Sequence, residues 1–306
     1  MPGAVILGGD GFIGRHITTA MAREGYSVLV VARAPAAGHH RVPGHRRVSA
    51  DLATTPPARL ASLLSTVRPA VVVNAIGGVW GVTEREMESA NHAVTTRLVA
   101  ALSLLNPSPR LVQLGSVLEY GPVEVGVPVG TDVPTRPVTA YGRTKLAATR
   151  AVVESSVDAM VLRLSNVIGP GVPTVSLLGQ VATELAEARN RGRVAAVELA
   201  PLRARRDFVD VRDVAEAVVL AAGAEASGVV NIGRGEAVGV RTLVDLLISV
   251  SGVPVRIVER PDAGATPRGE LDWFQADLAG ATGLLGWKPR RTLPETVRAF
   301  WEDFTA

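Results

Sequence analysis

Ser116, Tyr141 and Lys145 are residues whose types and spacing could together move a proton to or from a carbonyl oxygen. Tyr141 and Lys145 stand four positions apart in a stretch predicted to be helical, which places both on one helix face. A tyrosine with a pKa of about 10 exchanges protons poorly at neutral pH unless a neighbouring cation lowers that pKa. Lys145 supplies such a cation, and it is one of only two lysines in the chain. Ser116 lies 25 residues before Tyr141, after a predicted strand, so the three residues together predict a catalytic site.

A glycine-rich loop near the start of the chain has the form of a dinucleotide-binding turn. Its glycines have the spacing G-x-x-G-x-x-G, directly after the apolar run 4–7 and at the opening of an amphipathic stretch. Glycine permits the tight turn and lets backbone N–H groups approach a pyrophosphate at the positive end of a helix. The predicted cofactor-binding residues of this loop are Gly8, Gly11, Phe12, Ile13 and Gly14.

The end of the next apolar run bears on the choice between NAD and NADP. An acidic residue there would hold the ribose 2′-hydroxyl, whereas an arginine accommodates a 2′-phosphate. The run 26–32 ends in Arg33 with no acid nearby, which predicts NADP(H), while a solvated loop arginine remains the alternative. Asp10 inside the glycine loop is unusual at an anion site, and we expect its carboxylate to point away from the phosphates.

Strand-like and helix-like segments alternate along the chain, which favours a Rossmann-like, doubly wound α/β fold with a parallel sheet. The strand candidates are short apolar runs of the kind that is buried on both faces. The predicted strands are 4–7, 26–32, 70–74, 110–114, 159–164 and 229–232, and the predicted helices between them are 58–67, 84–105, 140–155 and 211–222.

The pattern changes from Gly169 onward, where proline and glycine cluster before a predicted helix 177–192. We expect the chain to return to the main sheet near Val209 and to leave it again after Ile232. The remaining segments predict a smaller, discontinuous α+β lobe. The resulting division is 1–168 plus 206–233 for the cofactor-binding domain and 169–205 plus 234–306 for the smaller lobe.

Composition excludes several classes of protein. The chain has 306 residues, 47% of them hydrophobic, which excludes intrinsic disorder. It has no cysteine, so a disulfide framework, a thiolate metal site and a cysteine nucleophile are all excluded; no metal site is expected at the histidines either. Its charge of +3 comes from scattered residues, without the basic face of a nucleic-acid binder. Without a signal peptide or a run of about 18 apolar residues, we expect a soluble cytoplasmic protein without a membrane segment.

Further motifs run the length of the chain. They are Gly8–Gly14, Asp51-Leu52, Asn74-Ala75, Asn91, Gly115–Gly121, Tyr141–Lys145, Arg163–Gly171, Arg206–Asp213, Asn231–Gly235 and Leu285–Pro289. In these motifs the sequence resembles the extended short-chain dehydrogenase/reductases, the NAD(P)-dependent sugar epimerase/dehydratase family.

The resemblance implies that Tyr141 is the general acid/base, that Lys145 tunes it and binds the nicotinamide ribose, and that Ser116 hydrogen-bonds the reacting oxygen. It also implies a nucleotide-sugar substrate in the smaller lobe, and a homodimer formed through the helices that carry Asn91 and Tyr141. The further cofactor residues that it implies are Asp51, Leu52, Ala75, Ile76, Gly77 and Asn91. The implied substrate residues are Ser116, Asn166, Arg206 and Arg268, the last shifted by one position from the family pattern.

Departures from the family pattern select among its reactions. The 4,6-dehydratases carry an Asp-Glu pair after the serine position, where this chain has Val117 and Leu118, and the 3,5-epimerase/4-reductases need a cysteine. The stretches Gly115–Gly121 and Arg206–Asp213 most resemble those of the nucleotide-diphospho-4-keto-6-deoxyhexose 4-ketoreductases of deoxysugar biosynthesis. We therefore expect NADPH-dependent reduction of a C4 ketone.

Two other functions stay open at this point. An NAD-dependent nucleotide-sugar 4-epimerase would keep its cofactor bound and consume none. A non-catalytic NADP-sensing regulator is disfavoured, because Tyr141 and Lys145 are both present. The sequence does not identify the nucleotide or the sugar.

Overall fold

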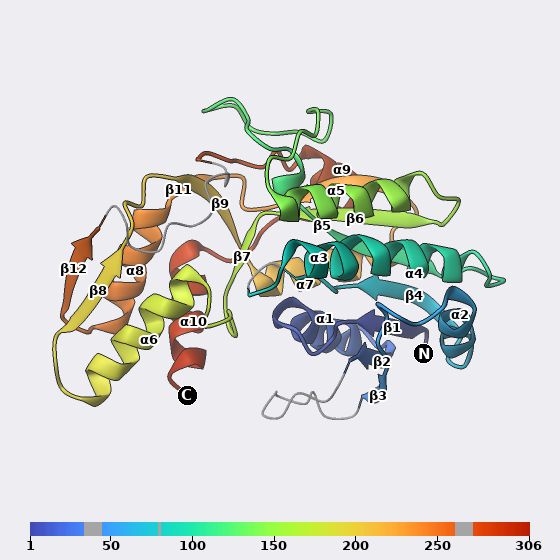
Figure 1. Ribbon diagram of the computed structural model, residues 1–306, viewed down its shortest axis with the longest axis horizontal. Helices are drawn as coiled ribbons and strands as arrows, with labels where there is room; N and C mark the ends of the chain where they lie inside the picture. The colour runs from blue at the N-terminus through green and yellow to red at the C-terminus, as the bar shows by residue number, and fades with distance from the viewer. Residues whose placement is uncertain (34–44, 79–80, 261–271) are drawn as a thin grey trace.

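The computed structural model of the chain describes residues 1–33, 45–78, 81–260 and 272–306 (Figure 1). Within these residues, seven parallel strands form the main sheet in the order β10-β6-β5-β4-β1-β2-β3. The strands are β1 (Gly3–Leu7), β2 (Ser27–Ala32), β3 (Arg46–Ser49), β4 (Pro69–Asn74), β5 (Arg110–Ser116), β6 (Ala159–Leu164) and β10 (Gly228–Ile232). The direction in which strands are added reverses between β1 and β4, and in open α/β sheets ligands bind outside the carboxyl ends of strands at such a point.

Helices cover both faces of the main sheet, which explains why its strands are short apolar runs. One core cluster joins the sheet to α1 (Phe12–Arg23) and α7 (Val211–Gly223). A second cluster, on the other face, joins it to α2 (Pro57–Ser65) and α4 (Val94–Leu102), beside which α5 (Ala140–Val153) packs. The predicted doubly wound α/β fold is confirmed.

The predicted helix 84–105 is interrupted in the structure. It consists of α3 (Glu84–Met87), one π-helical stretch over Glu88–Ala93 and α4. A π-helical turn inserts an extra residue and shifts the side chains after it around the helix axis. The stretch contains Asn91, which it turns toward the buried side.

A second group of elements lies on the other side of the molecule (Figure 1). It comprises α6 (Leu177–Asn190), β8 (Ala195–Leu199), α8 (Val240–Ser251), β12 (Val255–Glu259) and α10 (Leu293–Phe304). Strands β8 and β12 pair in parallel, and the helices enclose an apolar core that includes Leu185, Val244, Leu247 and Phe300. Helix α9 (Ala279–Leu285) returns to pack on β10.

The expected return to the main sheet near Val209 is wrong. Strand β9 (Arg205–Asp210) instead pairs with β7 (Asn166–Ile168) and β11 (Ala237–Gly239) in a separate sheet between the two sides. The buried carboxylate of Asp207 accepts hydrogen bonds from the backbone N–H groups of Arg234, Gly235 and Ala276, which fixes β9 against those loops. The chain rejoins the main sheet only at β10, and the proposed division into two domains stays a prediction.

No helix in the described part of the chain has the length and hydropathy needed to cross a lipid bilayer.

Candidate active site

Ser116 lies at the carboxyl end of β5, the edge at which ligands bind in open α/β sheets. Its backbone is extended, and it caps the 3₁₀ turn η2 (Val117–Glu119), since its hydroxyl oxygen accepts a hydrogen bond of 3.2 Å from the Leu118 N–H. The residue is buried, so the hydroxyl is held in place by this turn.

Tyr141 lies in the first turn of α5, near enough to Ser116 for the Ser116 side chain to lower the pKa of the Tyr141 phenol in part. The close approach of α5 to η2 requires glycine at the next position: a Cβ on Gly142 would lie 2.4 Å from the Leu118 carbonyl oxygen. The hydroxyl of Thr139 caps the helix by accepting from the Gly142 N–H. The sequence therefore brings the predicted pair Ser116 and Tyr141 together.

Lys145 lies one turn further along α5 and is 3% exposed. Its Nζ donates a hydrogen bond to the backbone carbonyl of Leu114 on β5. Burial, partly opposed by the Glu119 carboxylate, lowers the pKa of Lys145 to about 8. The ammonium group thus lies beneath the strand end that presents Ser116.

Tyr141 keeps its proton at neutral pH in this arrangement. Burial and the negative charge of Glu119 raise the pKa of Tyr141 to about 12, against the opposing effect of the Ser116 side chain. A protonated phenol beside a serine hydroxyl can donate a proton to an oxygen that becomes negative. The expected lowering of this pKa by Lys145 is therefore wrong, although the phenol retains the proton that a general acid must donate.

Glu119 is a buried charge that sequence reasoning did not assign to the site, although it lies in the motif Gly115–Gly121. Its side chain is 0% exposed, and its carboxylate accepts from the Ser116 N–H and from the Arg163 guanidinium. The only signal in the sequence was its place three residues after Ser116, the spacing of a capping box.

The glycine loop fits a dinucleotide pyrophosphate. Helix α1 begins after Gly11, which offers no side-chain cap, and its first turn holds no acidic residue. A Cβ on Gly14 would lie 2.1 Å from the Gly8 carbonyl oxygen, so loop and helix approach each other as closely as only glycine allows. The N–H groups at this helix start are thus available to an anion.

The loop after β4 is held by buried amides. Asn74 donates to Gln113 at 2.9 Å and to Thr95 at 3.1 Å, and its oxygen accepts from the Ile76 N–H. Asn91 bonds to the backbone of Gly78 and donates to Thr144 at 2.9 Å. The predicted residues Ala75, Ile76, Gly77 and Asn91 therefore lie along one edge, between the glycine loop and α5.

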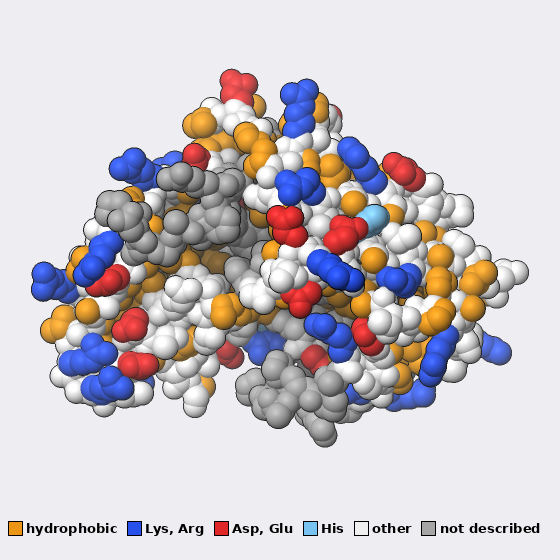
Figure 2. Space-filling model, in the orientation of Figure 1, with side chains coloured by type: hydrophobic (Ala, Val, Ile, Leu, Met, Phe, Trp, Pro, Cys, Tyr) orange, Lys and Arg blue, Asp and Glu red, His pale blue; other side chains and the backbone are white. Residues whose placement is uncertain are grey.

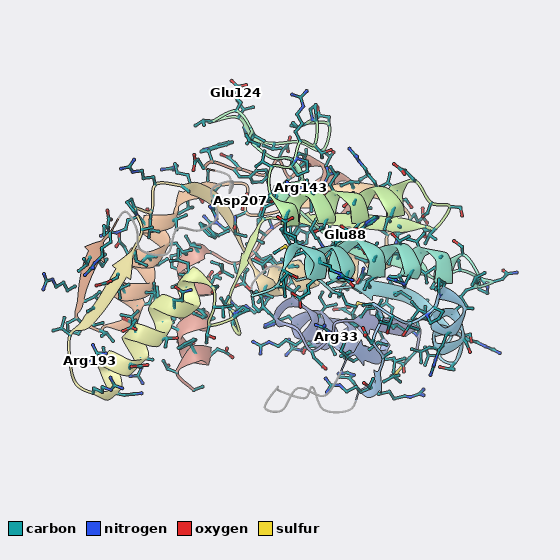
Figure 3. All side chains as sticks on the ribbon, in the orientation of Figure 1. Arg33, Glu88, Glu124, Arg143, Arg193 and Asp207 are labelled. Carbon is teal, nitrogen blue, oxygen red and sulfur yellow. The ribbon has the colours of Figure 1, made fainter. Side chains whose placement is uncertain are left out.

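The expected adenosine end of the site is more exposed. Arg33 follows β2 and its side chain is exposed, at the edge of the main-sheet part (Figure 3). Asp10 forms an ion pair with Arg47 on β3, and its expected orientation away from the phosphates stays a prediction. Asp51 follows β3 and accepts from the Ala53 N–H at 3.1 Å, while the Leu52 side chain is buried in the core.

Two of the predicted substrate residues, Asn166 and Arg206, lie on the sheet between the two sides. Asn166 begins β7 and donates to the backbone carbonyl of Asp207 at 3.1 Å, and Arg206 is on β9. Asp207 lies where the two sides meet (Figure 3). Arg268 lies outside the described residues.

The chain is similar in sequence to a family of known nucleotide-dependent enzymes and to two named relatives. The profile of the "NAD dependent epimerase/dehydratase family" matches residues 4–233. The chain is 46% identical over 302 residues to dTDP-6-deoxy-L-talose 4-dehydrogenase (NAD(P)(+)) of Kitasatospora kifunensis, covering 97% of this chain and 93% of the relative. It is 28% identical over 216 residues to GDP-6-deoxy-D-mannose reductase of Pseudomonas aeruginosa, covering 69% and 70%.

A solved structure shares the whole fold. The structure of MoeE5 in complex with UDP-glucuronic acid and NAD superimposes with a TM-score of 0.81 at 26% identity, covering 98% of this chain and 97% of that one.

Proposed function

This chain belongs to the NAD-dependent epimerase/dehydratase family, and we propose that it reduces the C4 ketone of a nucleotide-linked 4-keto-6-deoxyhexose with NADPH. The reverse reaction is the oxidation of the C4 alcohol, the activity for which the Kitasatospora relative is named. The observation that carries the proposal is the Ser116–Tyr141 contact above the Lys145 ammonium group, in a chain 46% identical to that dehydrogenase.

Tyr141, Ser116 and Lys145 have different roles in the proposed reduction. Bound NADPH supplies the hydride that forms the new C4–H bond. The Tyr141 hydroxyl gives its proton to the former ketone oxygen, and Ser116 donates a hydrogen bond that orients this oxygen. The positive charge of Lys145 would stabilise the tyrosinate that remains, and the family resemblance implies that Lys145 would also hold the nicotinamide ribose. The products are the C4 alcohol and the oxidised cofactor, and the tyrosinate regains its proton from water.

One arginine supports NADP(H) over NAD(H). Arg33 directly follows β2, next to the glycine loop, and its side chain is exposed, whereas Arg47 on the neighbouring strand β3 is already paired with Asp10. Guanidinium groups bind phosphate with paired hydrogen bonds, which a 2′-phosphate offers and a 2′-hydroxyl does not.

The proposed substrate is a dTDP-linked 4-keto-6-deoxyhexose whose reduction at C4 gives a 6-deoxytalose. The support is the name of the 46% identical relative, which spans nearly the whole of this chain. Asn166, Arg206 and Arg268 are the residues that we propose for the nucleotide sugar, with Arg206 at its diphosphate.

A 4-epimerase that retains NAD is the second candidate, because the matching family includes epimerases by name. It differs from the reductase in one measurable respect. An epimerase returns the same hydride to C4 and consumes no cofactor.

We also propose that the chain forms a homodimer through α3, α4 and α5. Figure 2 shows acidic, basic and apolar side chains interspersed over this face, and Glu88 and Arg143 are exposed on it (Figure 3). A two-fold axis would bring the acid of one subunit near the base of the other. Sedimentation equilibrium measures the mass in solution, and a value of one chain would contradict the dimer. The expected cytoplasmic location stays a prediction.

The experiment that tests the reductase follows NADPH and NADH absorbance while a dTDP- or GDP-4-keto-6-deoxyhexose is supplied, the dTDP ketone in the configuration that C4 reduction converts to 6-deoxytalose. The proposal predicts oxidation of NADPH that is faster than that of NADH, and faster with the dTDP sugar. Oxidation of neither cofactor, with NAD released on denaturation, would instead identify the epimerase.

A further inference from the structure

The buried carboxylate of Glu119 forms hydrogen bonds with groups of the proposed catalytic site and of the strands and helix around it. It is fully buried, and one of its oxygens accepts from the Ser116 N–H at 2.8 Å and from the Thr149 hydroxyl at 3.0 Å. The other oxygen accepts from Arg163 Nε at 2.8 Å. One of these contacts therefore goes directly to the backbone of a residue in the proposed catalytic site.

The charge of Glu119 also acts on the other two members of that site. It favours the ammonium form of Lys145, and it disfavours the ionised form of Tyr141. The described charged and titratable groups around it are Lys145 and Tyr141 on α5, Arg163 on β6 and Tyr120 after η2. Glu119 thus contacts the Ser116 backbone and acts electrostatically on Tyr141 and Lys145.

The surrounding structure is built to hold this carboxylate. A Cβ on Gly115 would lie 2.8 Å from a Glu119 carboxylate oxygen, so glycine at that position makes room for it. Behind it, Arg163 donates to the Tyr120 hydroxyl at 3.1 Å, which donates to Asn231 at 2.8 Å. A chain of satisfied buried hydrogen bonds is rigid, because breaking any member leaves a polar group without a partner.

We propose that Glu119 is a positioning residue for the proton transfer: its buried carboxylate fixes Ser116 through the Ser116 N–H and is itself held on α5 by the Thr149 hydroxyl. This role rests on the proposed function only in assigning the reaction to Ser116, Tyr141 and Lys145. Glu119 acts through these residues and does not touch the substrate.

The first test is the Glu119→Gln variant, which keeps the size of the side chain and an acceptor oxygen but removes the charge. Without the carboxylate, Lys145 loses its proton at a lower pH, and Tyr141 becomes more acidic. Reduction needs both groups protonated, so the high-pH limb of kcat should move down by about one pH unit. We expect kcat at neutral pH to fall by about tenfold, a fraction of what general acid catalysis contributes, with KM changed less than twofold.

A second readout needs no substrate. Because the chain has only two lysines, protein labelled with ¹³C at lysine Cε gives a resonance for Lys145 and one for Lys288, the internal reference. The Lys145 resonance should titrate at lower pH in Glu119→Gln than in the wild type, while the Lys288 resonance is unchanged between them. Assignment follows from Lys288→Arg.

Two variants separate positioning from structural support. Thr149→Val removes another hydrogen bond from the same carboxylate oxygen without changing the charge, and should leave the Lys145 titration and the pH profile as in the wild type. Glu119→Asp retains the charge on a shorter side chain, so the titration should return toward that of the wild type while kcat stays reduced. If Glu119→Gln fails to fold because Arg163 is left unpaired, Glu119→Gln with Arg163→Met removes both buried charges.

The outcomes are distinct. An unchanged Lys145 titration and pH profile in Glu119→Gln, or the same losses in Thr149→Val, would overturn the positioning role. A shifted titration in a protein whose wild type reduces no 4-keto sugar would support that role and refute the proposed function.

Discussion

Polar side chains are buried and hydrogen-bonded to one another on the main-sheet side of the molecule, but lie mainly at the surface on the side formed by α6, α8 and α10. Beside β5, buried polar groups bond to one another, as in the pairs Asn74–Gln113 and Glu119–Arg163. On the other side, α6, α8 and α10 enclose an apolar core, and ion pairs such as Arg241–Glu259 lie at the surface. A network of buried hydrogen bonds fixes directions, whereas apolar packing fixes only shape. The main-sheet side thus fixes the direction of its buried polar groups, whereas the other side forms an apolar core with charges at its surface.

The largest effect is expected from a substitution of Tyr141, in the hydrogen-bonded site on the main-sheet side. Tyr141→Phe removes the proton donor while leaving the ring, so turnover should fall by about 10²–10⁴-fold. NADPH binding, followed by fluorescence titration, should change little, because the glycine loop is untouched. Turnover at the wild-type rate would remove Tyr141 from the mechanism.

Core substitutions test whether the two sides serve different ligands. Leu247→Ala on α8 and Leu98→Ala on α4 each truncate a fully buried leucine, and each should lower the free energy of unfolding by about 2–5 kcal/mol. Urea denaturation measures this cost. At a temperature where both variants stay folded, only Leu247→Ala should raise KM for the nucleotide sugar. A rise in KM for NADPH alone in that variant would contradict the proposal that the side containing α8 binds the nucleotide sugar and the main-sheet side binds the cofactor.

Arg33→Ala tests the proposed contact between Arg33 and the cofactor 2′-phosphate at the exposed end of the cofactor site. Hydrogen bonds to a charged group contribute about 1.5–3 kcal/mol, so KM for NADPH should rise by about tenfold or more, and KM for NADH should not change. The matched control is Arg193→Ala, another exposed arginine on the far side (Figure 3). Equal effects on both cofactors would show that Arg33 does not contact the 2′-phosphate.

The smallest effect is a pH dependence of stability. The pKa of Lys145 is about 8 in the folded chain against 10.5 for the free side chain, so its burial destabilises the fold fully below pH 8. This penalty disappears as pH rises from 8 to 10.5, because the unfolded chain then also loses the proton. Lys145→Met should therefore gain stability over the wild type at pH 7, with a smaller gain at about pH 9.5. Urea denaturation at the two pH values checks this, and a gain that grows with pH would contradict it.

Residue type and spacing were enough to predict the parts of the site that depend on local sequence. The Gly8–Gly14 loop, the strand end at Ser116 and the helix face shared by Tyr141 and Lys145 each follow from a short-range rule. The alternation of strands and helices likewise predicted the doubly wound sheet.

Features that depend on distant partners were missed. Strand β9 begins Arg205-Arg206-Asp207, which does not read as a buried strand until the loop N–H groups that bond Asp207 are known. Strand β3 is an exposed edge strand without an apolar pattern. The burial of Glu119 depends on Arg163, which is 44 residues away. Hydrophobic periodicity carries no information on such pairs.

Transfer of a deuterium label tests the central claim most directly. The protein is supplied with NADPH carrying deuterium at the transferable position of nicotinamide C4, together with a dTDP-4-keto-6-deoxyhexose, and the product is analysed by mass spectrometry and NMR. The reductase assigned to Ser116, Tyr141 and Lys145 predicts one deuterium at sugar C4 for each NADPH consumed. Recovery of the unchanged ketone with no loss of NADPH, together with interconversion of the two C4 alcohols of the dTDP sugar without added cofactor, would contradict it.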